Sequence, residues 1–225
     1  GDALTDGGSN TGLGKGALGT TVSGTRMVGV GQGAIGGGNT TAAAIGTIAI
    51  GLDSLYLLTE GIGNVAIGYQ SLDAATDSDF NTAVGHQALT AMTGTAGTVG
   101  NTAMGYQAGL AITKGKANTA IGYHALYSDD VGDGSTAIGQ EALNSQNSDS
   151  DNETTGNTGV GNYTGYHNVT GTNNTYLGYS AGQGVSGKSH NGCVFIGKNA
   201  GLTAYTGDDN IAIGHDAMKD VDAGT

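Results

Sequence analysis

The sequence predicts an all-β protein, a parallel β-solenoid (β-roll or β-helix) of about twelve coils with 17 to 22 residues each. Three observations lead to this prediction. The chain is rich in glycine and lacks proline, a nine-residue motif recurs along its length, and turn-forming residues fill the segments between the motifs. We therefore expect residues 1–225 to form a single repeat region, in a processed chain or in a segment of a longer fibre.

The composition argues against an ordinary globular core. The chain has 45 Gly, no Trp and two Phe, and small side chains supply most of its hydrophobic fraction of 37%. Such side chains suit thin, regular packing. The regular spacing of the apolar residues also argues against disorder, which a composition rich in Gly, Ser, Thr and Asn would otherwise suggest.

The motif is clearest in three copies: NVAIGYQSL at 64–72, NTAVGHQAL at 81–89 and NTAIGYHAL at 118–126. Its positions are numbered one to nine from the asparagine, and position five is the glycine that marks each of twelve copies. These glycines are Gly14, Gly31, Gly51, Gly68, Gly85, Gly105, Gly122, Gly139, Gly161, Gly178, Gly197 and Gly214. The longer spacings recur at intervals of 54 residues, so three copies form a larger duplicated unit.

Positions two to four predict a short strand, because β-branched or other apolar residues flank an Ala or Gly with a period of two. A helix is disfavoured because each turn would contain glycine. We expect positions two and four to point into the coil, together with the Ala–Leu pair at positions eight and nine. The residues expected to stack inside at position four are Ile67, Val84, Met104, Ile121, Ile138, Val160, Leu177, Ile196 and Ile213.

Stacking of the coils would place the same motif position of successive coils in one row, which forms a ladder of similar side chains. The asparagines at position one, such as Asn64, Asn81 and Asn118, are expected to hydrogen-bond from coil to coil. Each coil buries few apolar side chains, whereas ordering its backbone costs ~1–2 kcal/mol per residue. We therefore expect several chains to share a core, in a homotrimer.

The NTAIGYxAL pattern resembles the repeats of bacteriophage tail fibres, especially those that precede a self-cleaving intramolecular chaperone domain. It also resembles, more loosely, the head repeats of trimeric autotransporter adhesins. The segments that carry the resemblance are Asn64–Leu72, Asn81–Leu89, Asn101–Gly109, Asn118–Leu126, Asn174–Gly182 and Asn210–Met218, and the repeats cover essentially the whole chain. The resemblance implies a trimeric fibre on a virion or at an extracellular cell surface.

The charge balance disfavours some partners. The net charge is −12, and the seven basic residues form no cluster that could neutralise phosphates, so nucleic acid is not an expected partner. No run of 18 apolar residues is present, so no membrane insertion is expected. The single Cys193 excludes a disulfide within the chain.

No catalytic, cofactor-binding or metal-binding constellation is evident, so the chain is not expected to be an enzyme. The segment GVGQGAIG at 29–36 lacks the strand–helix context of a dinucleotide site. The five histidines (His86, His124, His167, His190 and His215) are expected at the surface. The acidic returns are expected to carry solvated charges rather than Ca²⁺; they contain Asp77, Asp79, Asp129, Asp130, Asp133, Asp149, Asp151, Asp208 and Asp209.

Position six is the best candidate for a contact surface, because aromatic residues recur there. They are Tyr69, His86, Tyr106, Tyr123, Tyr179 and His215. If this row faces outward, it suits stacking on the sugars of a cell-surface glycan. If it faces another chain, it is a seam between subunits. The sequence leaves both interpretations open.

The favoured function is a structural or adhesive segment of a phage tail fibre, which spaces or presents host-receptor binding. The alternative is a bacterial cell-surface trimeric adhesin or an extracellular filament subunit. A third alternative is an ice-binding solenoid, which a flat ladder of threonines at position two would suit. Val65, Val194 and Ile211 interrupt this ladder, and we therefore expect position two to point inward, which argues against ice binding.

Overall fold

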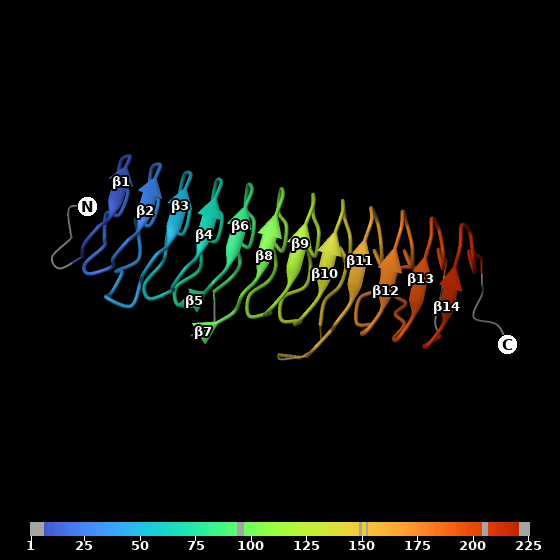
Figure 1. Ribbon diagram of the computed structural model, residues 1–225. Helices are drawn as coiled ribbons and strands as arrows, with labels where there is room; N and C mark the ends of the chain where they lie inside the picture. The colour runs from blue at the N-terminus through green and yellow to red at the C-terminus, as the bar shows by residue number, and fades with distance from the viewer. Residues whose placement is uncertain (1–6, 94–96, 149, 152, 204–206, 221–225) are drawn as a thin grey trace. The chain divides into compact units, whose positions relative to one another are not determined.

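The computed structural model describes residues 7–93, 97–148, 150–151, 153–203 and 207–220, which belong to two compact units, 1–114 and 115–225. Each unit is a stack of coils in which every motif contributes one strand (Figure 1). The predicted fold class is confirmed: the chain is an all-β parallel β-solenoid with about 11 turns of about 17 residues.

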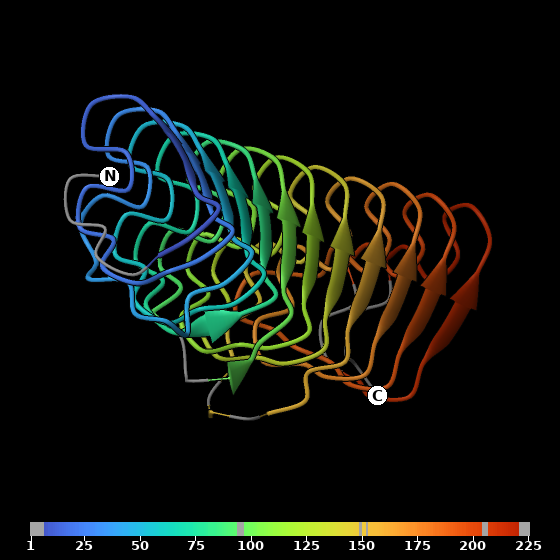
Figure 2. The ribbon, with the colours of Figure 1, turned by 60° about the vertical axis from the view of Figure 1, so that its left-hand side comes forward.

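The strands of each unit pair in parallel with their neighbours. The first unit contains β1 (Thr11–Leu13), β2 (Val28–Val30), β3 (Ile48–Ile50), β4 (Val65–Ile67), β6 (Thr82–Val84) and β8 (Thr102–Met104), with β5 (Ser78–Asp79) paired to β7 (Gly97–Thr98) elsewhere. The second unit contains β9 (Thr119–Ile121), β10 (Thr136–Ile138), β11 (Thr158–Val160), β12 (Thr175–Leu177), β13 (Val194–Ile196) and β14 (Ile211–Ile213). In each unit the motif strands lie along one side of the coils, and the polar returns close the coils behind them (Figure 2).

The register explains why the motif repeats so closely. Equal motif positions face each other in neighbouring strands, as Ala66 faces Ala83 and Ile67 faces Val84. The glycine at position five ends every strand with a φ between 125° and 140°, which side chains rarely adopt. A Cβ on Gly122 would lie 2.4 Å from the carbonyl oxygen of Gly139 in the next coil. The backbones therefore approach too closely for any residue but glycine.

The core includes position three, the pair at positions eight and nine, and the third residue after that pair, where Leu58, Met92 and Ile112 are buried. Ala66 and Ala83 are fully buried, as are Ala88 and Leu89. The Ala–Leu pair was predicted correctly, and the position-nine leucines adopt a left-handed conformation, with φ near 50° in Leu89 and its equivalents. This bend turns each leucine into the coil, where it packs over the small side chains of the strand.

The prediction that positions two and four point inward is wrong. Ile67 and Ile138 are 36% exposed, and Met104 and Leu177 are 46% exposed. Of the remaining residues predicted inside, Ile213 is exposed, and the four others, Val84, Ile121, Val160 and Ile196, are partly exposed. The coil interior is so thin that Ala at position three and Leu at position nine fill it, and strand alternation then turns positions two and four outward.

Two coils of the second unit exchange large and small core residues. Position three is Tyr176 in β12 and Phe195 in β13, and both are fully buried. Position nine of the same coils is Gly182 or Gly201, where a Cβ would lie 2.3 Å from the Tyr176 ring or 2.6 Å from the Phe195 ring. In these two coils an aromatic residue at position three and glycine at position nine thus fill the space that alanine and leucine fill in other coils.

The asparagine ladder is confirmed. The Nδ2 of Asn64 donates to the carbonyl oxygen of Ser78 (2.7 Å), and its Oδ1 accepts from the backbone N–H of Asn81 (2.8 Å). Asn157 binds Gly171 and Asn174 in the same way. Each buried side chain therefore satisfies backbone groups of the next coil that the short strands leave unpaired.

Candidate functional site

The outer face of each sheet is an apolar, uncharged surface. It consists of positions two and four, which hold only Thr, Val, Ile, Leu and Met in all twelve copies. In the first unit the exposed members include Ile48, Ile50, Ile67 and Met104, with exposed fractions between 36% and 46%. Soluble monomers rarely expose a contiguous apolar surface of this kind unless it binds something. This outer sheet face is therefore a candidate contact surface in each unit.

Position six is exposed in the single chain, as both the glycan and the subunit-seam interpretation require. Tyr69, Tyr106, Tyr123 and Tyr179 are 39% to 51% exposed, and His86 and His215 are also exposed. In the first unit, the ring centroids of Tyr69 and His86 lie 4.8 Å apart, and those of His86 and Tyr106 lie 5.2 Å apart. These three rings form a continuous aromatic row on the surface.

The predicted row is less regular in the second unit. Tyr123 stacks on His124 within its own coil, with 4.0 Å between ring centroids, and Tyr179 meets Tyr163 edge-on at 6.0 Å. Burial is the main cause that lowers the pKa of His124, so this ring is neutral near pH 7. The interruption follows from the sequence, because Gln140 and Asn162 occupy position six between Tyr123 and Tyr179, and Lys198 occupies it between Tyr179 and His215.

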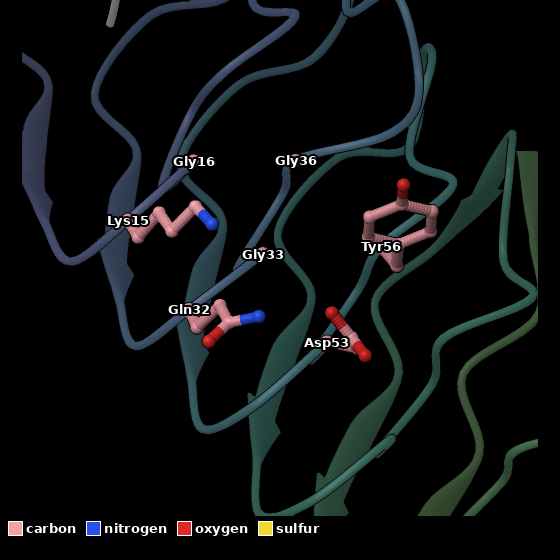
Figure 3. Close-up of a pocket in the computed structure, with 7 residues that line it drawn as sticks. All are labelled: Lys15, Gly16, Gln32, Gly33, Gly36, Asp53 and Tyr56. Carbon is pink, nitrogen blue, oxygen red and sulfur yellow. The ribbon is translucent and has the colours of Figure 1, made fainter.

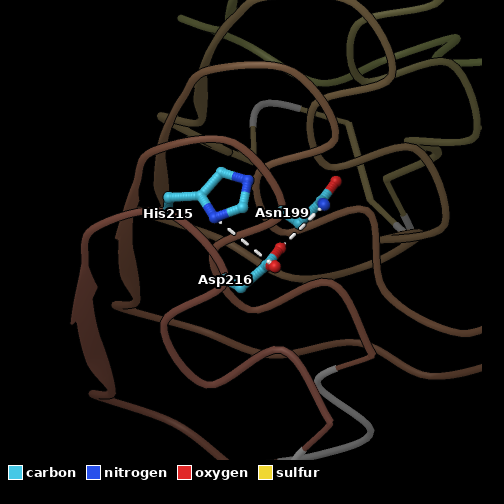
Figure 4. A network of polar contacts seen from close by, with 3 residues as sticks. All are labelled: Asn199, His215 and Asp216. Carbon is cyan, nitrogen blue, oxygen red and sulfur yellow. Dashed lines mark hydrogen bonds and ion pairs between the residues drawn. The ribbon is translucent and has the colours of Figure 1, made fainter.

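His215 closes the row with a polar contact instead of a ring contact. Its Nδ1 lies 3.4 Å from the Asp216 carboxylate, which also accepts a hydrogen bond of 2.8 Å from Asn199 Nδ2 (Figure 4). The hydrogen bond from Asn199 is the main cause that lowers the pKa of Asp216. His215 is 64% exposed, so this ion pair lies in water and contributes little to stability.

One histidine contradicts the expected surface location. His190 is 1% exposed, and its Nε2 lies 2.7 Å from the Tyr176 hydroxyl oxygen. Its Nδ1 has no hydrogen-bond partner among the described residues. Burial lowers the pKa of His190 to about 4, against a smaller opposing effect of Asp208. His190 is therefore a neutral core residue that fills the space beside Tyr176 and Phe195.

The acidic returns also hold one buried carboxylate, contrary to the prediction of solvated charges. Asp129 is fully buried and accepts hydrogen bonds from Gln146 Nε2 (2.5 Å), Ser148 Oγ (3.1 Å) and the Gly132 N–H (3.2 Å). Asp133 and Asp208 each accept a hydrogen bond from a backbone N–H of the preceding coil. These carboxylates therefore hold the returns together. Asp149 lies outside the described residues.

A recess that the sequence did not indicate lies on the first unit. Lys15, Gln32, Asp53 and Tyr56 surround it, and glycines form its floor (Figure 3). Its volume is about 220 Å³. The sequence did contain one sign of this recess: position seven is glycine in the first two coils and Asp53 in the third. This difference was missed because the repeats were compared for the residues that they share.

Comparison with known protein families, curated proteins and solved structures finds no match for this chain. Among the described residues, no three His, Cys, Asp or Glu side chains come together in a way that could hold a metal ion. The same residues form no helix with the length and apolarity needed to cross a membrane. The functional argument for the candidate surfaces therefore depends on the structure of this chain alone.

Proposed function

We propose that the chain is a structural segment of a homotrimeric fibre, whose subunits pack through their outer sheet faces. The observation that carries this proposal is the uncharged surface that positions two and four form in each unit. Ile48, Ile50, Ile67 and Ile138 are 36% to 38% exposed in the single chain, and burial of that remainder is worth ~0.5–1 kcal/mol for each side chain. Over many coils these small terms add up to a stable interface.

Charge supports a second copy of this chain as the occupant of the face. The net charge of −12 makes two copies repel each other wherever their returns meet. The outer sheet faces carry no charge and have equal spacing in every copy, so they can approach without this repulsion. Three copies around a common axis cover all three faces and leave the negatively charged returns in solvent.

The closely similar coils favour a role as a spacer. A receptor pocket needs different residues that converge in one place, whereas a repeat offers one face at regular intervals. We therefore propose that the segment holds a host-recognition tip away from a phage particle as part of its tail fibre. A bacterial cell-surface adhesin or an extracellular filament would use the same geometry. The coding sequence beyond Thr225 distinguishes them: a self-cleaving chaperone domain supports the tail fibre.

The assembly is tested by two charged substitutions, Ile67→Asp and Ile138→Asp, one in each unit. Both side chains already face outward, so the coils should keep their β-rich circular dichroism spectrum. Multi-angle light scattering should show a trimer for the unchanged chain and a folded monomer for the double variant. A folded monomer of the unchanged chain would falsify the trimer proposal. A dimer would support the outer sheet face as the interface but would contradict the three-fold assembly.

The matched variant replaces Tyr106, Tyr123 and Tyr179 with Ala on the position-six side. We expect it to remain trimeric, because these rings lie outside the outer sheet face. Dissociation of this variant instead would make the aromatic row the subunit seam. The same measurement therefore separates the two interpretations of position six.

A second candidate function, ice binding, gains support from the outward direction of position two. The expectation of an inward position two was wrong, and the threonines there are at least partly exposed. They are Thr11, Thr82 and Thr102 in the first unit and Thr119, Thr136, Thr158 and Thr175 in the second. Parallel strands space them at about 4.8 Å in a regular row. Thermal hysteresis of the purified chain tests this candidate, and its absence would overturn it.

A further inference from the structure

We propose that the recess on the first unit binds one neutral sugar ring of a surface polysaccharide. This inference rests on the proposed function, because a fibre at a cell or virion surface meets such polysaccharides. It differs from the aromatic row at position six in location and kind: it is one discrete site, formed where the repeat changes.

The recess exists because side chains are missing at defined places. Gly16 and Gly33 occupy position seven and Gly36 occupies the third position after it, whereas the next coil carries Asp53 and Tyr56 at these two places. The surface layer is therefore absent over two coils and resumes in the third as a wall. A Cβ on Gly33 would collide with the Asp53 carboxylate, so the glycine floor keeps this wall in position.

The backbone fixes the polar groups around the recess. The Gly33 N–H donates to the Lys15 carbonyl (3.0 Å), and the Asp53 N–H donates to the Gln32 carbonyl (2.9 Å). These bonds hold Lys15, Gln32 and Asp53 on three successive coils. Their side chains make no hydrogen bond or ion pair with other described residues, so an ammonium, an amide and a carboxylate remain available to a ligand.

Tyr56 supplies the apolar part of the site. Its carbonyl accepts hydrogen bonds from the N–H groups of Gly37 (2.8 Å) and Gly38 (3.0 Å). Its ring lies so close to Gly37 that a Cβ there would collide with it, and the side chain is still 39% exposed. A rigid aromatic wall beside hydrogen-bond donors and acceptors fits a sugar, which has apolar C–H faces and a rim of hydroxyl groups.

Size and charge narrow the ligand class. A volume of about 220 Å³ is below the ~300–1,000 Å³ of pockets that enclose drug-sized ligands, so the recess holds one small unit at a time. A phosphate group would meet the Asp53 carboxylate beside the single Lys15. A divalent cation would find only one carboxylate where it prefers six or more oxygen ligands. A neutral sugar ring with vicinal hydroxyl groups can hydrogen-bond to both Lys15 and Asp53 without charge repulsion.

The test is saturation-transfer difference NMR on the full chain with three neutral probes: methyl glucoside, methyl galactoside and N-acetylglucosamine. At about 10 mM, a site with millimolar affinity should transfer saturation to the ring protons of at least one probe. Tyr56→Ala should abolish the signal, and Asp53→Asn should weaken binding by about tenfold, whereas Tyr56→Phe should retain it. Tyr106→Ala is the matched control on the aromatic row and should change nothing.

Three results would overturn the proposal. The first is the absence of a saturation-transfer signal from all three sugars, and the second is a signal that survives Tyr56→Ala. The third is a signal that Tyr106→Ala removes, which would place binding on the aromatic row. Stronger binding of free glycine or inorganic phosphate would assign the recess to a zwitterion or an anion instead. Circular dichroism and light scattering of each variant report fold and assembly separately, so loss of sugar binding is distinguishable from failure of the fibre proposal.

Discussion

The exchange of core residues around Tyr176 gives the sharpest prediction about the fold. We expect Tyr176→Ala and Gly182→Leu to destabilise the chain when made singly and to compensate each other when combined. The double variant restores the combination of Ala at position three and Leu at position nine that five other coils use. Its backbone already suits leucine, since Gly182 has a φ of 56° and the position-nine leucines have φ values between 49° and 54°.

The magnitudes follow from the packing. Tyr176→Ala removes a fully buried ring, which costs ~3–5 kcal/mol, and leaves His190 Nε2 without its partner, which adds ~1–3 kcal/mol. Gly182→Leu places a Cβ 2.3 Å from the Tyr176 ring and should cost ~1–3 kcal/mol or more through overpacking. In the double variant the leucine fills part of the space that the ring occupied.

The assay is urea unfolding at one fixed protein concentration, followed by far-UV circular dichroism and tyrosine fluorescence. The loss of free energy of unfolding in the double variant should be ~1–3 kcal/mol smaller than the sum of the two single losses. As a control, Gly182→Leu combined with Ala120→Gly, three strands away, should be additive within ~0.5 kcal/mol. Additivity of the Tyr176 and Gly182 variants would refute the idea that the two positions share one core volume.

Three further predictions concern the same stack. The pKa of His190 is about 4 in the folded chain, against an ordinary value of 6.5, so between these pH values only the unfolded chain binds a proton there. The free energy of unfolding should therefore be constant above pH 6.5 and fall by ~3 kcal/mol as the pH drops to 4. Urea midpoints measured across this range check this prediction. Asn157→Ala should cost ~1–3 kcal/mol, because it leaves the Asn174 N–H unpaired and removes the shorter of two hydrogen bonds to the Gly171 carbonyl, and hydrogen exchange at Asn174 should accelerate. Gly122→Ala should prevent correct stacking on the next coil, which circular dichroism would report as lost β structure.

Each of these predictions has an outcome that would contradict it. A double variant with Phe at positions 176 and 190 removes the titrating group together with its partner, so a pH dependence that persists there would not arise from His190. Unchanged stability of the Asn157 variant would mean that water replaces the side chain. A folded Gly122 variant with normal stability would mean that neighbouring coils can separate at little cost.

The sequence by itself determined the repeat and therefore the local structure. The position-five glycine ends each strand, the asparagine before the strand forms the ladder, and the Ala–Leu pair fills the coil. These features are predictable because each depends on backbone conformation or on neighbouring coils of the same composition. The aromatic–glycine exchange at Tyr176 and Gly182 was also visible in the sequence, as a paired departure from the motif, although only the structure gives it meaning.

The tertiary structure decided which side of each strand is the inside. A period of two shows that positions two and four share a face, but it does not assign that face when the alternate residue is Ala and therefore also apolar. The inside proved to be the face that Leu89 and its equivalents cover from the far side of the coil. That contact depends on the left-handed bend at position nine, which brings leucine back over the strand. The same bend leaves Ile67 and its neighbours as an outer surface, and it is on this surface that the proposed assembly depends.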